Sequence, residues 1–426
     1  MYRFLYSVLL YLLVPFILLR LLIRSLRAPA YRNRIGERFA LAPLPAQFNL
    51  SRQTIWIHAV SVGETVAAAS LVTALRKRFP QGQILVTTMT PTGSDRVRAL
   101  FGDTVIHTYL PYDLPGVMQR FIRKTSPVML ILMETELWPN LLHAAHSAGV
   151  RLVLANARMS EKSATAYRRF ATAIRSMLLQ FDCIAAQSDT DAQRLLALGA
   201  RREAVTVTGS LKFLVDIAVP NQVSNPVFDS VRGAGRPVLI AASTREGEEA
   251  KVLIAFRSCL AARQNLLLLL VPRHPERMER VARQCAAAGL VLQRRSAGKP
   301  VASSTQVLLG DSMGEMLQYY RLATIAFVGG SLVDTGCQNV LEPAALGIPI
   351  VVGPSQFNFA TICTQLEQTG ALHTVADEVQ LAQFVTDLLG DADQQQRMGH
   401  SGKSLVRANQ NALPALMSRI ESLLPG

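Results

Sequence analysis

Short apolar runs alternate with helix-type patterns along most of the chain. The first half contains seven such runs, IWIHAV, ILVTTM, VIHTYLP, VMLILM, RLVLAN, CIAAQS and VTVTGS, each separated from the next by ten or more residues. Five more follow in the second half, VLIAAS, LLLLLVP, VLLGD, IAFVGGS and IPIVVGP, before a helical tail that starts near residue 378. This spacing is typical of βαβ units, in which helices bury both faces of a parallel sheet. The pattern predicts an α/β protein with two doubly wound sheets.

The alternation breaks once, between the two series. Residues 216–237 are rich in Pro, Asn and Gly, which predicts a linker between domains at 28–215 and 238–426. The length of 426 residues also exceeds the size at which single cores stop growing. Two facing domains of this kind hold ligands in the cleft between their strand-end loops.

The first 27 residues have a different pattern. Residues 4–19 carry no charge, and Arg20 is followed by three further apolar residues, so the segment reaches the ~20 residues of a spanning helix only if Arg20 snorkels. A cleaved signal peptide is the alternative, because Ala28-Pro29-Ala30 weakly resembles a cleavage site. An arginine cluster follows the apolar segment, at positions 20, 24, 27, 32, 34 and 38. By the positive-inside rule we predict that residues 1–27 are a membrane anchor and that the remaining chain is cytoplasmic.

The net charge limits the classes of partner, and the cysteine pattern limits the kinds of site. The formal net charge of +14 indicates an anionic partner: nucleic acid, a membrane surface or a phosphorylated substrate. Nucleic acid is disfavoured, because aromatic residues make up 6% of the chain and neither RNA-binding nor zinc-finger signatures occur. Five scattered cysteines without a CxxC pair indicate neither a disulfide framework nor a thiolate metal site.

The stretch AVSVGET, after the first apolar run, permits two readings. Ser61 and Glu64 have the spacing of a capping box, in which a serine and a glutamate satisfy the first amides of a helix. The same spacing recurs at Ser188 and at Ser312, so local pattern alone favours a helix start over chemistry.

Polar residues follow other strands of the first half. Glu134 and Glu136 come after VMLILM, and two residues of that spacing on an extended chain point the same way. Paired carboxylates at a strand end suit a functional site as well as a solvated edge. Arg158 and Lys212 bring cations to strand ends, where they suit phosphate or carboxylate groups.

The second half has strand-end loops suited to an anion. Ser243, Arg273, residues 310–315 and residues 329–331 each follow an apolar run, although single turns and surface ion pairs give the same pattern. The run from Gly336 to Pro349 resembles the E-P-x-x-x-G donor-site signature of two-domain, GT-B type glycosyltransferases. There is no Walker A motif and no GxGxxG in the first strand–helix turn, which disfavours P-loop and standard dinucleotide sites.

Taken together, these motifs resemble one family. SVGET, TTMTPTG, YLPYD, METELWPN, ANAR, GSLKF, VPRHPER, GDSMGEM, FVGGSLV and QNVLEPA occur in this order behind an arginine-flanked apolar segment. The chain is similar along its whole length to the 3-deoxy-D-manno-octulosonic acid (Kdo) transferases of lipopolysaccharide assembly. The resemblance implies a GT-B enzyme with two Rossmann-like domains facing a central cleft and an N-terminal anchor in the bacterial inner membrane. It further implies inverting transfer of Kdo from CMP-Kdo to the tetraacylated, bisphosphorylated lipid A precursor (lipid IVA), with no metal, no other cofactor and no nucleic acid.

The resemblance also assigns residues. It places the general base on Glu64, whose position in the first turn of a helix is expected to keep it ionised, and transition-state support on Glu134 and Lys212. The implied CMP site consists of Pro272, Arg273, Met313, Gly314, Glu315, Asn339, Val340, Leu341 and Glu342, with Ser243, Gly330 and Ser331 as second choices. Cys337-Gln338 and Leu214 differ from the usual family pattern.

Two alternatives are kept open. A nucleotide-sugar epimerase would have the same two-domain architecture but would act on the nucleotide sugar alone, and a membrane anchor argues against it. A non-catalytic, membrane-bound protein for anionic lipid or nucleic acid would bind tightly without turnover.

Overall fold

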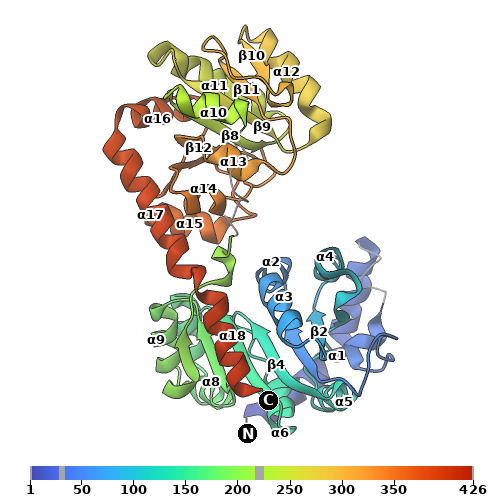
Figure 1. Cartoon of the computed structure of the whole chain (residues 1–426). Coiled ribbons are helices and arrows are strands. Elements are labelled where there is room, and N and C mark those ends of the chain that lie inside the picture. The colour runs from blue at the N-terminus through green and yellow to red at the C-terminus, as the bar shows by residue number, and fades with distance from the viewer. Residues whose placement is uncertain (1, 28–33, 216–224, 425–426) are drawn as a thin grey trace. The chain divides into compact units, whose positions relative to one another are not determined.

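The computed structural model describes residues 2–27, 34–215 and 225–424. The chain forms two compact units (Figure 1). Unit 1 comprises Met1–Leu214 together with Asn409–Gly426, and unit 2 comprises Val215–Ala408. Each unit contains one seven-stranded sheet in which every described strand pair is parallel, as the apolar pattern predicts.

The sheet of unit 1 has the order β3-β2-β1-β4-β5-β6-β7. Its first strand, β1, pairs with β2 on one side and with β4 on the other, so the strand order reverses there. In open α/β sheets, ligands bind beyond the carboxyl ends of the strands at this switch point. The strands are β1 (Thr54–His58), β2 (Gln83–Thr88), β3 (Ile106–Tyr109), β4 (Pro127–Met133), β5 (Arg151–Ala157), β6 (Cys183–Ala186) and β7 (Val205–Val207).

Helices cover both faces of this sheet, because successive strand residues point to opposite sides. Trp56 belongs to one buried cluster with residues of α5, α6, α8 and α9, whereas Ile57 belongs to a second cluster with α2, α3, α4 and α18. The helices are α2 (Val62–Ala67), α3 (Ala69–Arg78), α4 (Pro91–Phe101), α5 (Pro115–Thr125), α6 (Pro139–Ser147), α7 (Glu161–Arg168), α8 (Ala171–Leu178), α9 (Asp189–Ala197) and α18 (Ala412–Leu423), with short 3-10 turns η2 (Ile35–Phe39), η3 (Gly102–Thr104), η4 (Arg202–Ala204) and η5 (Leu211–Phe213).

The helical tail corrects the predicted domain boundary. The sequence pattern assigned 238–426 to the second domain, but the chain from Asn409 onward belongs to unit 1. Ala412, Leu416 and Ile420 are fully buried in the cluster that contains Ile57. Their four-residue spacing forms one face of α18, and that face closes the core of unit 1.

Unit 2 contains the sheet order β10-β11-β9-β8-β12-β13-β14. Its predicted strands are present as β8 (Val238–Thr244), β9 (Leu267–Pro272), β11 (Val307–Leu309), β12 (Ile325–Val328) and β13 (Ile350–Val352). The apolar pattern does not predict β10 (Leu292–Arg294) and β14 (Leu372–Thr374), which are three-residue strands at the two sheet edges. Leu292 and Leu372 are the single apolar residues of these strands, so neither strand forms an apolar run.

The helices of unit 2 include one in the segment that the sequence pattern predicts as a linker. Residues 216–224 lie outside the described part, but α10 (Pro226–Gly233) occupies most of the rest of the predicted linker. Asn225 caps this helix by accepting from the Val227 amide at 3.0 Å, and Val227 and Phe228 are buried against the sheet. Asn-Pro marks a helix start here rather than a loop. The other helical elements are α11 (Glu248–Ala262), η6 (Pro275–Arg277), α12 (Met278–Ala287), η7 (Arg295–Ala297), α13 (Met316–Tyr320), α14 (Leu341–Leu346), α15 (Ala360–Gln368), α16 (Glu378–Gly390) and α17 (Ala392–Gln410).

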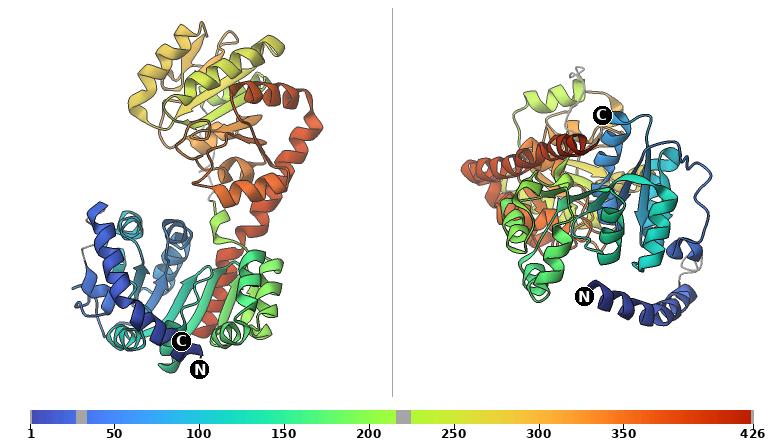
Figure 2. Two further views of the ribbon diagram at one scale, coloured as in Figure 1. Left: turned by 180° about the vertical axis from the view of Figure 1, so that it is seen from behind. Right: turned by 90° about the horizontal axis from the view of Figure 1, so that it is seen from below.

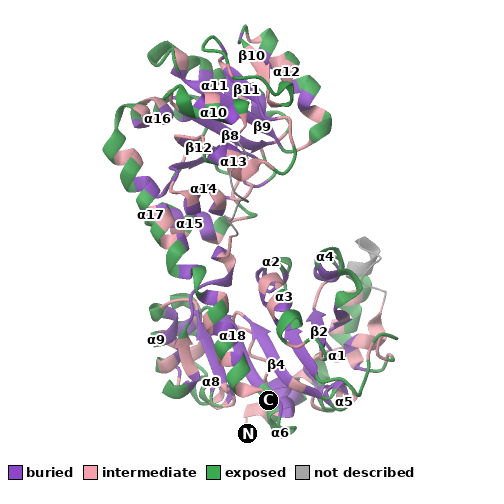
Figure 3. Cartoon of the chain, viewed as in Figure 1, coloured by how far each residue is buried: buried purple, intermediate pink, exposed green. Residues whose placement is uncertain are grey.

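The N-terminal apolar segment forms one helix, α1 (Tyr2–Arg27), which runs along the outside of unit 1 (Figure 2). Its residues Tyr2–Ile23 are long and apolar enough to cross a membrane. Most of its side chains are exposed, in contrast to the strands of both sheets (Figure 3). Its first two turns are nevertheless attached to unit 1: the Tyr2 hydroxyl donates to Ser176 Oγ at 2.9 Å, and Ser7 Oγ donates to Asn140 Oδ1 at 3.1 Å.

Candidate active site

Glu64 begins the helix after β1, as the capping pattern predicts. Ser61 is the N-cap of α2, and its Oγ accepts from the Glu64 amide at 3.2 Å. The Glu64 carboxylate in turn accepts from Ser61 Oγ and from the Val60 amide, both at 2.8 Å. In the usual capping box the carboxylate returns to the amide of the cap residue itself, whereas here it bonds one residue earlier.

The position of Glu64 also suits proton transfer. Burial raises the pKa of its carboxyl above 4.5, with a smaller contribution from Glu134. The hydrogen bonds from Ser61 and Val60 and the charge of Lys212 act in the opposite direction. The helix start was expected to keep Glu64 ionised, but burial has the larger effect and favours the protonated carboxyl. A base becomes more effective as its pKa approaches neutral pH.

Glu134 follows β4, the strand that pairs with β1 at the switch point. Its carboxylate forms an ion pair with Lys212 Nζ at 2.5 Å, and both side chains are partly exposed. Its backbone has a φ of 58°, in the left-handed region that non-glycine residues rarely adopt. Such residues cost about 1–3 kcal/mol and cluster at functional sites.

Lys212 is held in place by residues distant in sequence. It lies in η5 after β7, and the amides before it donate to asparagine side chains. The Leu211 amide donates to Asn156 Oδ1 at 3.0 Å, and the Ser210 amide donates to Asn409 Oδ1 at 2.6 Å. Asn156 also has a positive φ, 55°, at the end of β5. The C-terminal segment thus supports the loop that carries the lysine.

Glu136 joins the same cluster, although it is absent from the site residues that the resemblance assigns. Burial, with the nearby charges of Glu64 and Glu134, raises its pKa to about 7, and the Trp138 indole donates to it at 2.9 Å. The spacing of two residues between Glu134 and Glu136 is the sequence signal that could have added Glu136 to the predicted site. Three carboxylates and one lysine therefore meet at the switch point of unit 1. This arrangement can accept a proton and offset a developing negative charge.

In unit 2, the predicted CMP residues lie in three segments: the end of β9, the loop before α13 and the start of α14. Asn339 organises the start of α14: its Oδ1 accepts from the Leu341 amide at 3.0 Å, and its Nδ2 donates to Glu342 at 3.1 Å. Burial raises the pKa of Glu342, while Asn339 and the charge of Arg273 lower it. Arg273 follows Pro272 at the end of β9 and is exposed. Val340 has no exposed surface, in its side chain or its backbone, so the structure leaves a ligand no access to this predicted residue.

Another of these segments is the loop before α13. Glu315 forms an ion pair with Arg295 at 2.8 Å and accepts a hydrogen bond from Ser312. Gly314 has a φ of 78°, which suits glycine, and Met313 is 72% exposed. Helices α13 and α14 pack together, so this loop and the Asn339 loop belong to the same part of unit 2.

The structure contradicts the prediction that Gly330 and Ser331 are second-choice residues of the CMP site. The amides of Gly330 and Ser331 donate to the Glu248 carboxylate at 2.7 and 3.0 Å, and the Ser331 hydroxyl donates to the Val328 carbonyl at 2.6 Å. These groups are satisfied inside the protein and do not form an open phosphate site. The sequence could not show this, because Glu248 is 82 residues from Gly330.

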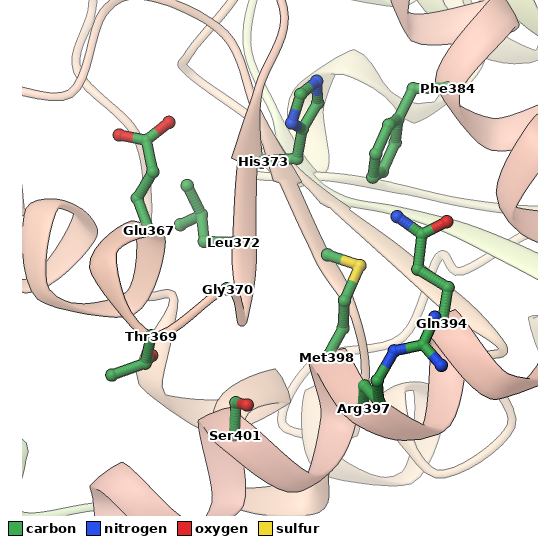
Figure 4. A pocket seen from close by; sticks show the side chains of 10 residues that line it. All are labelled: Glu367, Thr369, Gly370, Leu372, His373, Phe384, Gln394, Arg397, Met398 and Ser401. Carbon is green, nitrogen blue, oxygen red and sulfur yellow. The ribbon is translucent and has the colours of Figure 1, made fainter.

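A further pocket in unit 2 lies away from these loops. It measures about 530 Å³ and includes Leu372 and His373 of β14, with His373 stacked on Phe384 (Figure 4). Gly370, which precedes β14, also lines it. The pocket therefore borders the amino end of a parallel strand, whereas ligands of such sheets bind at the carboxyl ends.

Comparisons with known proteins define first a class and then a family. MurG from Acinetobacter baumannii shares the fold, with a TM-score of 0.51 and 12% identity over 87% of this chain and 99% of that chain. The architecture is thus the GT-B type, with two parallel α/β units and an N-terminal apolar helix. A family model for 3-deoxy-D-manno-octulosonic-acid transferases matches residues 33–215.

Two relatives carry the same name. The 3-deoxy-D-manno-octulosonic acid transferase of Haemophilus influenzae is 41% identical over 100% of this chain and 99% of its own length. That of Bordetella pertussis is 39% identical over 94% of this chain and 92% of its own length. The chain belongs to the Kdo transferase family and is a glycosyltransferase.

Proposed function

We propose that this protein transfers Kdo from CMP-Kdo to the tetraacylated, bisphosphorylated lipid A precursor, with inversion at the anomeric carbon. The observation that carries the proposal is the cluster at the switch point of unit 1. Glu64 is a buried carboxylate with a raised pKa, and it interacts electrostatically with the Glu134–Lys212 ion pair. A proton acceptor beside a cation is what glycosyl transfer to a hydroxyl requires.

In the proposed reaction, Glu64 takes the proton from the acceptor hydroxyl. The hydroxyl oxygen forms a bond to the anomeric carbon as the bond from that carbon to the CMP phosphate oxygen breaks, and the electron pair leaves with CMP. A single base suffices, since attack opposite the leaving group inverts the centre in one step. Lys212 offsets negative charge on the donor carboxylate or the departing phosphate, and Glu134 holds Lys212 by their 2.5 Å ion pair.

Unit 2 is proposed to bind CMP without a metal ion. Glu342 is a carboxylate near a helix start and suits ribose hydroxyls, while the exposed Arg273 suits the phosphate. Backbone atoms of residues 313–315 and of Asn339 and Leu341 complete the proposed site.

The net charge of the chain and its apolar N-terminal helix are both consistent with an acceptor that lies in a membrane. The proposed site of action is the cytoplasmic leaflet of the inner membrane, to which α1 anchors the protein. The formal charge of +14 favours an anionic membrane and a bisphosphorylated lipid.

Incubation of the full chain in detergent with CMP-Kdo and the tetraacylated lipid tests the proposal. Equal amounts of released CMP and lipid-bound Kdo, measured by chromatography and mass spectrometry, are expected. Release of CMP with unmodified lipid would reject lipid transfer, and conversion of the nucleotide sugar alone would favour an epimerase. Tight lipid binding without any turnover would favour a binding protein.

A further inference from the structure

Unit 1 contains an apolar pocket next to the carboxylate cluster. It measures about 740 Å³, within the roughly 300–1,000 Å³ that is usual for ligand sites. Its walls come from three places: Leu5 and Tyr6 of α1, the loop from Thr135 to Pro139, and Phe170 and Ile174 at α8. Such a composition suits a hydrocarbon and not a sugar or a nucleotide.

The pocket is open and apolar at its outer side. Phe170 is 68% exposed and Leu5 is 60% exposed. Large hydrophobic side chains gathered at one exposed place mark an interaction site. One wall is α1, the helix that is long and apolar enough for a membrane, so the opening faces the environment in which lipid chains occur.

The inner wall leads to the candidate active site. Among the described residues that line the pocket, Glu136 is the charged one. Glu136 also interacts electrostatically with Glu64 and Glu134. Glu136 therefore links the pocket wall to the carboxylate cluster that contains the proposed base.

The wall formed by α1 is fixed to unit 1. Tyr2 is hydrogen bonded to Ser176 of α8, and Ser7 is hydrogen bonded to Asn140 of α6. Asn140 is itself buried and donates to the Asp113 carbonyl at 2.7 Å. These contacts between α1 and two separate helices hold the pocket open as part of the folded unit.

We propose that this pocket binds one acyl chain of the lipid acceptor and thereby directs the acceptor's sugar head toward Glu64. The inference rests on the proposed function and adds to it the part of the substrate that the enzyme recognises. An acceptor held in this way is selected by its chains as well as by its phosphates.

Fluorescence quenching tests occupancy without turnover. The chain has two tryptophans, Trp138 in the pocket wall and Trp56 with no exposure in the core, so Trp56→Phe isolates Trp138. In detergent, an acceptor lipid with brominated acyl chains is expected to quench Trp138 saturably, and unlabelled acceptor is expected to reverse it. Quenching by a brominated phospholipid that the acceptor does not displace would assign the pocket to bulk lipid and overturn the proposal.

Filling the pocket provides a second test, which does not depend on Trp56→Phe folding. Ala173 lines the pocket, whereas its neighbour Thr172 is exposed and does not, so Ala173→Trp and Thr172→Trp form a matched pair. Ala173→Trp is expected to raise KM for the tetraacylated acceptor at least about tenfold. KM for a disaccharide bisphosphate without acyl chains, and both KM values of Thr172→Trp, are expected to stay at the wild-type level.

Equal losses on both acceptors in Ala173→Trp would show that the pocket serves structure only. If the wild-type enzyme modifies neither acceptor, the proposed function fails, and the quenching experiment then decides separately whether the pocket holds the lipid chain.

Discussion

The two units place a buried glutamate at the same point of their sheets, after the first strand and at the start of a helix. In unit 1, Glu64 accepts from one amide and one hydroxyl. In unit 2, Glu248 has no exposure and accepts from four amides, those of Arg245, Gly330, Ser331 and Leu332, at 2.7–3.0 Å. Burial raises the pKa of both carboxyls.

The difference lies in what surrounds each carboxylate. Glu248 bonds the amides of the loop after β12, where a ligand anion would otherwise bind, and so it joins two strand ends of unit 2. Glu64 interacts instead with other ionisable side chains, Glu134, Glu136 and Lys212. A raised pKa alone therefore does not single out Glu64 from Glu248, and it is the cluster of partly exposed charges around Glu64 that supports its proposed role.

The largest expected effect comes from Glu64→Gln. Glutamine is acceptable at this position of a helix start, so the unfolding temperature should stay near the wild-type value. Transfer should fall by ~10²–10⁴-fold, because a positioned base is lost. Steady-state rates and thermal unfolding measure the two quantities, and near-normal turnover would reduce Glu64 to a helix cap.

Lys212→Met should lower kcat by about 10²-fold, because a positioned charge at the transition state is lost. It also removes a charge that lowers the pKa of Glu64, so the acidic limb of the rate profile should move to higher pH. Glu134→Gln removes a charge that raises this pKa, and it should move the limb to lower pH. Rate profiles from pH 5 to 9 check this opposition, and shifts in the same direction would contradict it.

Glu248→Gln should show the reverse pattern to Glu64→Gln. The amide group cannot accept from four backbone donors, so unit 2 should lose about 1–3 kcal/mol of stability. Transfer per folded molecule should remain close to wild type. Denaturant unfolding monitored alongside activity tests this expectation, and a stable but inactive Glu248→Gln enzyme would place Glu248 in the reaction.

The smallest effect is expected from Glu136→Gln on stability. The folded-state pKa of about 7 lies above the unfolded value of 4.5, so the stabilisation is complete below pH 4.5 and is lost as pH rises through 7. Between pH 5 and 8 the melting temperature of the variant should therefore fall less than that of the wild type. The difference between the two falls should be on the order of 2 °C. Glu161→Gln, an exposed glutamate in α7, is the control. Burial also raises the pKa of Asp113 to about 7, so part of the pH dependence of stability should remain in both the wild type and the Glu136→Gln variant.

The sequence contained most of the fold because buried parallel strands are nearly continuous apolar runs. It did not show β10 and β14, whose edge positions need little apolar surface, or α10, whose Asn225-Pro226 start resembles a loop. The pattern of α18 predicts an amphipathic helix, but no periodicity states which sheet its apolar face covers.

The candidate site was less predictable from local sequence patterns than the fold. Local spacing gave Glu64 as a cap, and the structure confirms that contact. Its proposed role as a base came from the resemblance of the whole chain. The positive φ of Glu134 and the coupling of Glu136 to Glu64 depend on strands distant in sequence, so they could be found only in three dimensions.

The return of the C-terminal segment to unit 1 has a consequence for how the protein is made. Residues up to Leu214 leave the ribosome before unit 2, yet one face of the unit 1 core lacks α18 until the chain beyond Ala408 has been synthesised. Asn409, which holds the Ser210 amide beside Lys212, also arrives only then. Unit 1 is thus begun before unit 2 and completed after it, and a ribosome that stops short of Asn409 releases a chain with an open core and an unsupported lysine.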